Sequence, residues 1–182
     1  PLAYENVVFF DLTMFNMKGI EYHKFVAYFN YLFIGILISI FCIGLLIKSK
    51  NTVSTVLGKV FLLASGLLWA SLALFEGEIL ETNSEISDAV LIIFFLVLGL
   101  SSLGFFVLSI GEDFNKIISN KDFKWALLIV GLLSPILAVA KFSIQESFPF
   151  ILHLTIWLPY FLGFGILGLG ILISPYKEVG IE

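Results

Sequence analysis

The chain has 182 residues, of which 59% are hydrophobic and 13% are charged, and its formal net charge is −4. Soluble domains carry about 25% charged residues, so a chain this apolar cannot cover its surface with polar groups, and lipid is its predicted solvent. The pI of about 5.1 excludes nucleic-acid binding through a basic stripe, and the single cysteine, Cys42, excludes an intramolecular disulfide and a cysteine-based metal site.

No polar or Pro/Gly/Ser-rich linker divides the chain, so residues 1–182 are predicted to form a single membrane domain. Residues 1–24 are mixed in character, and their apolar run at 7–10 is far shorter than the roughly 20 residues that a span needs. With Tyr4, Phe15 and Tyr22 nearby, this segment is predicted to be an outer loop or short helix at the membrane interface.

Apolar runs predict the first and second membrane spans at residues 25–47 and 56–75. The first span has no charge, and its Gly35 and Ser39 lie four residues apart, which favours close contact with another helix. Lys59 lies in the first turn of the second span, and we expect its side chain to snorkel to the lipid head groups.

A lysine-free connection with four glutamates leads from the second span to the third, which is predicted at residues 88–110. Thr82 and Glu85 have the spacing of a capping box, so the third helix is expected to begin outside the bilayer and to enter it near Asp88. The glutamates are most simply a solvated loop, and a cation site is the alternative.

The fourth and fifth predicted spans each contain a proline. The span at residues 125–140 has only 16 residues, and Pro135 is expected to kink it. The span at residues 148–173 has Pro159 near its middle, followed by glycines at positions 163, 165, 168 and 170. Helix packing is the common use of such glycines, and close approach of a lipid or cofactor is the alternative.

Lysine placement sets the predicted orientation, because positively charged loops stay in the cytoplasm. Seven lysines fall on one side and three on the other: Lys48, Lys50, Lys59, Lys116, Lys121, Lys124 and Lys177 against Lys18, Lys24 and Lys141. The chain is therefore predicted to be a multi-pass protein of the cell membrane, with the N-terminal segment outside and the C-terminus in the cytoplasm.

Ionisable residues on the predicted outer side are the candidates for chemistry: Asp11, Glu21, His23, Glu76, Glu78, Asp88, Glu146 and His153. His153 is the most informative of them, because an ionisable group inside a span is costly and often functional. Its spacing places it on one helical face with Trp157, Tyr160 and Phe164.

A meeting of His153 with Glu76 or Asp88 would allow proton relay or metal binding, so these three are the candidate catalytic residues. A histidine hydrogen-bonded to a neighbouring helix is the more common arrangement. The sequence contains no zinc, haem or nucleotide-binding motif, so neither a metal site nor a cofactor is predicted.

Several short motifs resemble a known family, in the order Phe10-Asp11-Leu12-Thr13, Phe29-Asn30-Tyr31-Leu32-Phe33-Ile34-Gly35 and Leu72-Ala73-Leu74-Phe75-Glu76-Gly77-Glu78, with Glu146 eleven residues before Trp157. In these motifs the chain is similar to the bacterial and archaeal membrane family called domain of unknown function 998. The resemblance implies a fold of six helices, the first of them preceding this chain, and it implies no established activity.

Together these patterns predict an all-α integral membrane bundle, with five transmembrane helices in this chain and six in the full-length product. The leading functional hypothesis is a non-catalytic small subunit or accessory component that lies in the lipid bilayer and packs against partner membrane helices. One alternative is a small transporter or channel that uses the Pro/Gly-broken last two spans. The other is a lipid-acting enzyme with a carboxylate and histidine site on the outer side.

Overall fold

A computed structural model describes residues 29–48, 52–75, 88–111, 118, 120–143 and 151–173, with side chains throughout except at 48, 88–91, 138–143 and 151–156. Its elements are the π-helical turn η2 (Phe29–Phe33), α2 (Ile34–Lys48), α3 (Val53–Ser71), the 3-10 turn η3 (Leu72–Phe75), α5 (Asp88–Ile110), α7 (Lys121–Ser143) and α8 (Ile151–Ile173). Within these ranges there is no strand, so the all-α prediction is confirmed for them.

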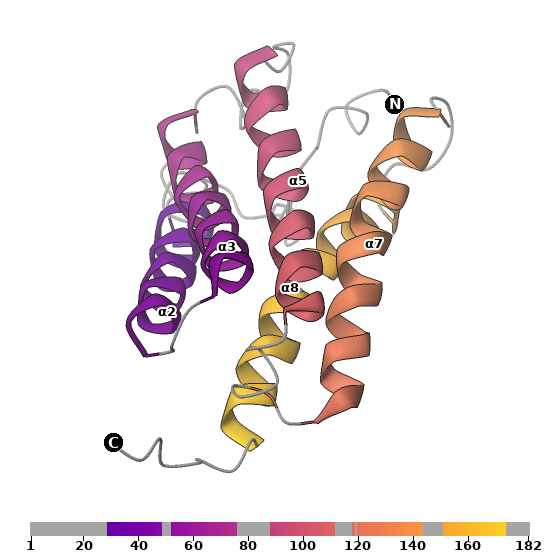
Figure 1. Cartoon of the computed structure of the whole chain (residues 1–182). Coiled ribbons are helices and arrows are strands. Elements are labelled where there is room, and N and C mark those ends of the chain that lie inside the picture. Colours follow the sequence, from indigo (N-terminus) through magenta and orange to yellow (C-terminus); the bar gives the residue numbers. More distant parts are fainter. Residues whose placement is uncertain are drawn as a thin grey trace, which may run out of the picture.

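The helices pack largely in chain order (Figure 1): α2 along α3, α3 along α5, α5 along α7, and α7 along α8. α5 is therefore the central helix, and it also touches α8. Aromatic side chains of α8 reach back across the bundle, where the ring centroids of Phe164 and Phe41 on α2 lie 6.5 Å apart. The described helices thus close around a shared core.

The outer surface of the bundle is apolar. Large side chains such as Ile40, Ile136 and Leu169 are more than half exposed. Three helical stretches, Phe29–Ile47, Val53–Phe75 and Ile92–Ile110, are long and apolar enough to cross a membrane, and Trp157–Ile173 is a shorter apolar helix. Length and composition therefore suggest association with a membrane.

The predicted boundaries hold best for the third span, since α5 has the predicted bounds Asp88–Ile110. α3 begins at Val53, earlier than the predicted 56, because Thr52 has extended backbone and its carbonyl accepts a bond of 3.0 Å from the amide of Val56. The first predicted span begins irregularly, because η2 precedes α2. The predicted interfacial segment 1–24 and the capping box at Thr82 and Glu85 lie outside the described residues.

α7 has 23 residues, Lys121–Ser143, and so extends beyond both ends of the predicted fourth span at 125–140. Its start is capped by Asn120, whose Oδ1 accepts a hydrogen bond of 2.8 Å from the amide of Asp122. Pro135 lies inside this helix and does not end it. α8 likewise runs from Ile151 to Ile173 through Pro159, and the residues predicted to precede it lie outside the described part.

The small-residue face predicted on the first span is confirmed as the contact between α2 and α3. A Cβ on Gly35 would lie 2.5 Å from the backbone nitrogen of Ala70, so only glycine allows this approach. One turn later, a Cβ on Gly66 would lie 3.0 Å from the hydroxyl oxygen of Ser39. That hydroxyl donates to the carbonyl of Gly35 at 2.8 Å, which leaves it no need of a partner across the interface.

Gly35→Ala is expected to lower the melting temperature of the purified protein in detergent, because the new methyl group overlaps the backbone of α3. The expected loss is about 1–3 kcal/mol, as for other overpacked interiors. Gly44→Ala on the same helix is the matched control, since no atom of the described residues lies within 4 Å of its Cβ position. Equal melting temperatures for the two variants would contradict the close contact of α2 with α3.

Candidate functional site

The predicted triplet of Glu76, Asp88 and His153 falls at the margin of the described residues. Asp88 is the first residue of α5 and His153 is the third of α8, but their side chains and the whole of Glu76 lie outside the description. The helices that carry these residues do meet nearby, because the ring of Trp157 contacts those of Trp69 and Phe94 in the core. A meeting of the three candidate side chains therefore stays a prediction.

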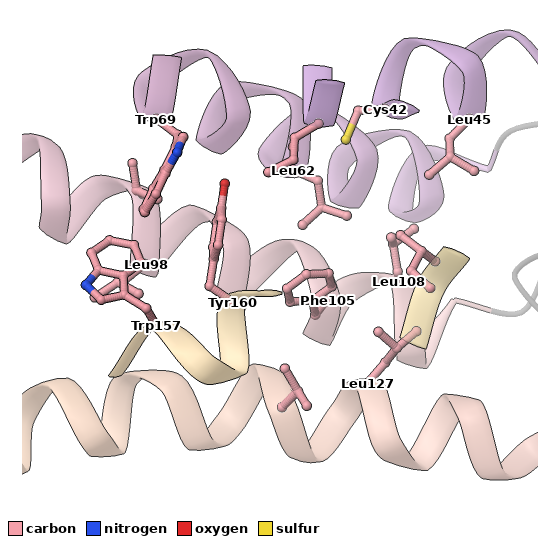
Figure 2. Packing of buried hydrophobic residues seen from close by; sticks show 14 of the residues in the cluster. Cys42, Leu45, Leu62, Trp69, Leu98, Phe105, Leu108, Leu127, Trp157 and Tyr160 are labelled. Carbon is pink, nitrogen blue, oxygen red and sulfur yellow. The ribbon is translucent and has the colours of Figure 1, made fainter. Parts of the chain in front are cut away.

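Trp69 of α3 is the centre of the aromatic cluster that the structure does bring together (Figure 2). Its indole is fully buried and stacks on Tyr160 of α8, with ring centroids 5.3 Å apart and an interplanar angle of 19°. Trp157 and Phe161 meet it edge-on, at 4.7 and 5.5 Å. Tyr31 of η2 lies 5.6 Å away on a tilt. A single side chain thus joins three helical elements.

A hydrogen bond fixes the orientation of this indole. The Nε1–H of Trp69 donates to the backbone carbonyl of Asn30 at 3.1 Å. A buried indole N–H needs such an acceptor, and the irregular turn η2 supplies it from a residue far away in sequence. Sequence analysis did not single out Trp69, although it continues the inward stripe of Leu62 and Gly66 at helical spacing.

The helical face predicted on the last span is confirmed for its described members. Trp157 and Tyr160 are buried and Phe164 is partly buried. The ring centroids of Tyr160 lie 5.8 Å from those of Trp157 and 5.2 Å from those of Phe164. α8 packs against the rest of the core through this aromatic face.

Most buried serine hydroxyls are bonded within their own helices. Ser65 donates to the carbonyl of Leu62 at 2.7 Å, Ser101 and Ser102 both donate to that of Leu98, and Ser109 donates to that of Phe106. Such back-bonding satisfies a hydroxyl in an apolar interior without a partner on another helix. These serines are therefore small residues that allow close helix packing, and their hydroxyl protons are already hydrogen-bonded within their own helices.

Tyr160 and Ser134 differ from these residues. Both hydroxyl oxygens are buried, and neither has a hydrogen-bond partner among the described residues. The Tyr160 hydroxyl points toward the side of the core that α2 and α3 form (Figure 2), and Ser65 of α3 lies close enough to interact with it. Tyr160 lies within the aromatic cluster around Trp69.

Lys59 corrects a prediction, because its side chain is fully buried and does not snorkel. Since α3 begins at Val53, Lys59 lies deeper in the helix than expected, on the inward face that also carries Thr55 and Leu62. Helical side chains lean toward the N-terminus of their helix, which directs Lys59 toward Thr55. Thr55 in turn abuts Gly111, at the carboxyl end of α5, where the negative end of the helix dipole favours a cation.

Among the residues that the structure describes, no three His, Cys, Asp or Glu side chains gather in positions that could hold a metal ion. No protein-family model matches the chain, and no curated protein or solved structure matches it significantly. The resemblance to the domain of unknown function therefore stays a prediction.

Trp69→Ala is expected to destabilise the protein by about 3–5 kcal/mol, because it removes the stacked centre of the core and leaves a large cavity. Trp125→Ala is the control, since Trp125 is 64% exposed and its loss should change the free energy of unfolding by no more than about 0.5 kcal/mol. Thermal unfolding of both variants in one detergent checks the contrast. Similar losses would mean that the Trp69 cluster does not hold the bundle together.

Proposed function

We propose that this chain is a five-span protein of the cell membrane, with its N-terminal segment outside and its C-terminus in the cytoplasm. In this proposal it acts as a non-catalytic small subunit or accessory component that packs against the transmembrane helices of another membrane protein. The proposal is supported by the apolar outer surface, by the lysine distribution, and above all by the placement of the glycines.

The observation that carries the proposal is a contrast between two sets of helical glycines. At Gly66, Gly104 and Gly163, a Cβ would run into a side chain of a neighbouring helix, so glycine permits close packing there. At Gly44, Gly99, Gly165 and Gly168, no atom of the described residues lies within 4 Å of the Cβ position. The second set thus consists of glycines, which are typical of close helix contacts, but no other described helix packs against them.

Glycine at such an open position has an energetic cost. In a helix interior it is about 0.8–1 kcal/mol less favourable than alanine, and contact with lipid gains nothing from the missing methyl group. Close approach of a partner helix does gain from it, because backbone atoms can then come into van der Waals contact. The open glycines therefore favour a bound helix over lipid alone.

Gly44 and Gly165 also locate the proposed contact. Both are exposed. Gly44 lies about one turn beyond Phe41 on α2, and Gly165 follows Phe164 on α8, so they flank the contact between these two rings. The open space beside each of these glycines forms a notch in the surface. An apolar helix that presents large side chains toward α2 and α8 would fill both notches.

Gly44→Leu and Gly165→Leu test this proposal, because the Cβ position of each glycine is open within the described protein and a leucine there would occupy the space proposed for the partner helix. Native mass measurement after extraction in mild detergent should give a species heavier than the 20.3 kDa chain, which the two variants reduce to the monomer. Ile129→Phe is the control, since it enlarges an exposed side chain on α7, a helix that carries neither Gly44 nor Gly165. A wild-type chain found only as a monomer would count heavily against the proposal.

A small transporter is the second candidate, and buried Lys59 favours it. An ionisable group enclosed within a helix long enough to cross a membrane is costly and commonly marks a path for protons or ions. α7 and α8 also each contain an internal proline, as in the broken helices that line substrate paths.

Proton flux into vesicles that contain the purified chain and a trapped pH-sensitive dye distinguishes this candidate. Lys59→Met keeps the side-chain length and removes the charge, so a transporter that depends on Lys59 should lose most of its flux. Lys121→Met, at an exposed residue, should leave the flux unchanged. Vesicles with the wild-type chain that leak no faster than empty vesicles would rule out proton transport.

A further inference from the structure

We propose that exposed aromatic side chains at the two ends of the bundle lie against the two head-group regions of a phospholipid bilayer. Trp125 marks one boundary, and the stacked rings of Phe29 and Phe33 mark the other. This placement rests on the proposed membrane location and adds to it the depth of the described helices in the bilayer. The neighbour of these side chains is then lipid and not a partner helix.

Trp125 identifies the first boundary. Of the three tryptophans in the chain, all of which the structure describes, Trp69 and Trp157 are buried in the core and Trp125 is 64% exposed. An indole combines an apolar ring with a polar N–H, so tryptophan is enriched where hydrocarbon gives way to lipid head groups. An exposed tryptophan at the start of a largely apolar helix therefore fits that boundary.

The face of α7 around Trp125 changes in polarity in the same order as a lipid molecule. Residues 120–122 precede Trp125 and are polar and exposed. Leu132 and Ile136 follow on the helical face of Trp125, about two and three turns further on, and both are exposed. Head groups beside 120–122, ester groups beside Trp125 and acyl chains beside Leu132 and Ile136 thus give each side chain a neighbour of its own polarity.

Contacts between helices show which residues lie at the depth of Trp125. Gly131 of α7 lies against the backbone of α5 at residues 102–106, and Gly111, at the end of α5, meets Thr55 of α3. α5 and α7 run in opposite directions (Figure 1). Trp125, six residues before Gly131, is therefore level with the end of α5 and with Thr55.

The stacked phenylalanines lie about 30 Å from that level. Gly35 of α2 meets Ala70 of α3, so Phe33 is level with the end of α3, and Phe29 lies one turn beyond. At 1.5 Å per residue, α3 rises about 25 Å between Thr55 and its end, and the turn of Phe29 extends this to about 30 Å. The hydrocarbon core of a bilayer is about 30 Å thick, so both groups of exposed rings fall at its boundaries.

The same placement gives the depth of buried Lys59. This residue lies one turn beyond Thr55, which puts its Cα about 6 Å inside the hydrocarbon core. A charged side chain at such a depth is costly unless it faces the interior of a bundle. The complete burial of Lys59 on the inward face of α3 meets that requirement.

Fluorescence quenching in phospholipid vesicles tests the depth of Trp125. The probes are phosphatidylcholines brominated either near the ester carbonyl or near the end of the acyl chain. The signal of Trp125 is the difference in emission between the wild type and Trp125→Phe, and the lipid brominated near the carbonyl should remove more of it. Trp125→Tyr provides the same difference if Trp125→Phe fails to fold.

Two tryptophans introduced singly into Trp125→Phe report on the other boundary and on the middle of the bilayer. Phe29→Trp should be quenched more by the lipid brominated near the carbonyl, as Trp125 is. Ile136→Trp is the matched control, because about 16 Å of α7 separates this exposed position from Trp125 and places it near mid-bilayer. The lipid brominated near the chain end should therefore quench Ile136→Trp more strongly.

Three results would overturn this placement, and they separate its failure from that of the proposed function. Stronger quenching of Trp125 or Phe29→Trp by the chain-end label would put that boundary elsewhere. Quenching of Ile136→Trp without quenching of Trp125 would mean that water or a partner chain covers Trp125, although the protein is in the membrane. If neither label quenches any of the three, the proposed membrane location itself is wrong.

Discussion

The stacked pair of Trp69 and Tyr160 is the interaction on which the rest of this structure depends. Helices surrounded by lipid gain little from burying apolar surface against one another, so their association relies on van der Waals packing and on hydrogen bonds. The pair supplies both kinds of contact, because the indole stacks on the phenol and donates its N–H to Asn30. It thereby connects η2, α3 and α8, which are separate in the chain.

This packing needs small residues opposite the large ones. A side chain on Gly163 would overlap the ring of Phe105, and one on Gly104 would lie 2.7 Å from Leu62. On α5, the central helix, serine and glycine face both neighbours, so the backbones of α3 and α7 can approach it closely. Large side chains from one helix therefore sit over the backbone of the next, and each interface is specified by a matched pair of residues rather than by general hydrophobicity.

Much of the fold follows from local features of the sequence, and the departures have physical causes. The uncharged run before Glu112 predicts α5 with its observed bounds, because apolar length is a strong signal. The burial of Lys59 was missed because its depth depends on where α3 starts, and Thr52 has no strong capping signature. α7 is longer than the apolar span predicted within it, because Lys121, Asp122 and Lys124 do not belong in a membrane span but continue a helix readily.

The candidate site was less predictable than the fold. Spacing placed Trp157, Tyr160 and Phe164 on one face, which is a property of a single helix. It did not indicate that Trp69 would stack there or that the Tyr160 hydroxyl would be buried in the described core, because both depend on how three distant segments meet. Tertiary packing decides which buried polar groups find a hydrogen-bond partner. Residue spacing in a single sequence does not predict this.

The reach of α8 back to Trp69 also has a consequence for the order of events during synthesis. The contacts of α2 with α3 and of α3 with α5 join neighbours in the chain, so they can form as soon as these helices have been synthesised. α8 follows these helices in the chain, so until it has been synthesised Trp69 lacks the Tyr160 ring on which it stacks. The core around Trp69 is thus completed only when α8 joins the helices that precede it in the chain.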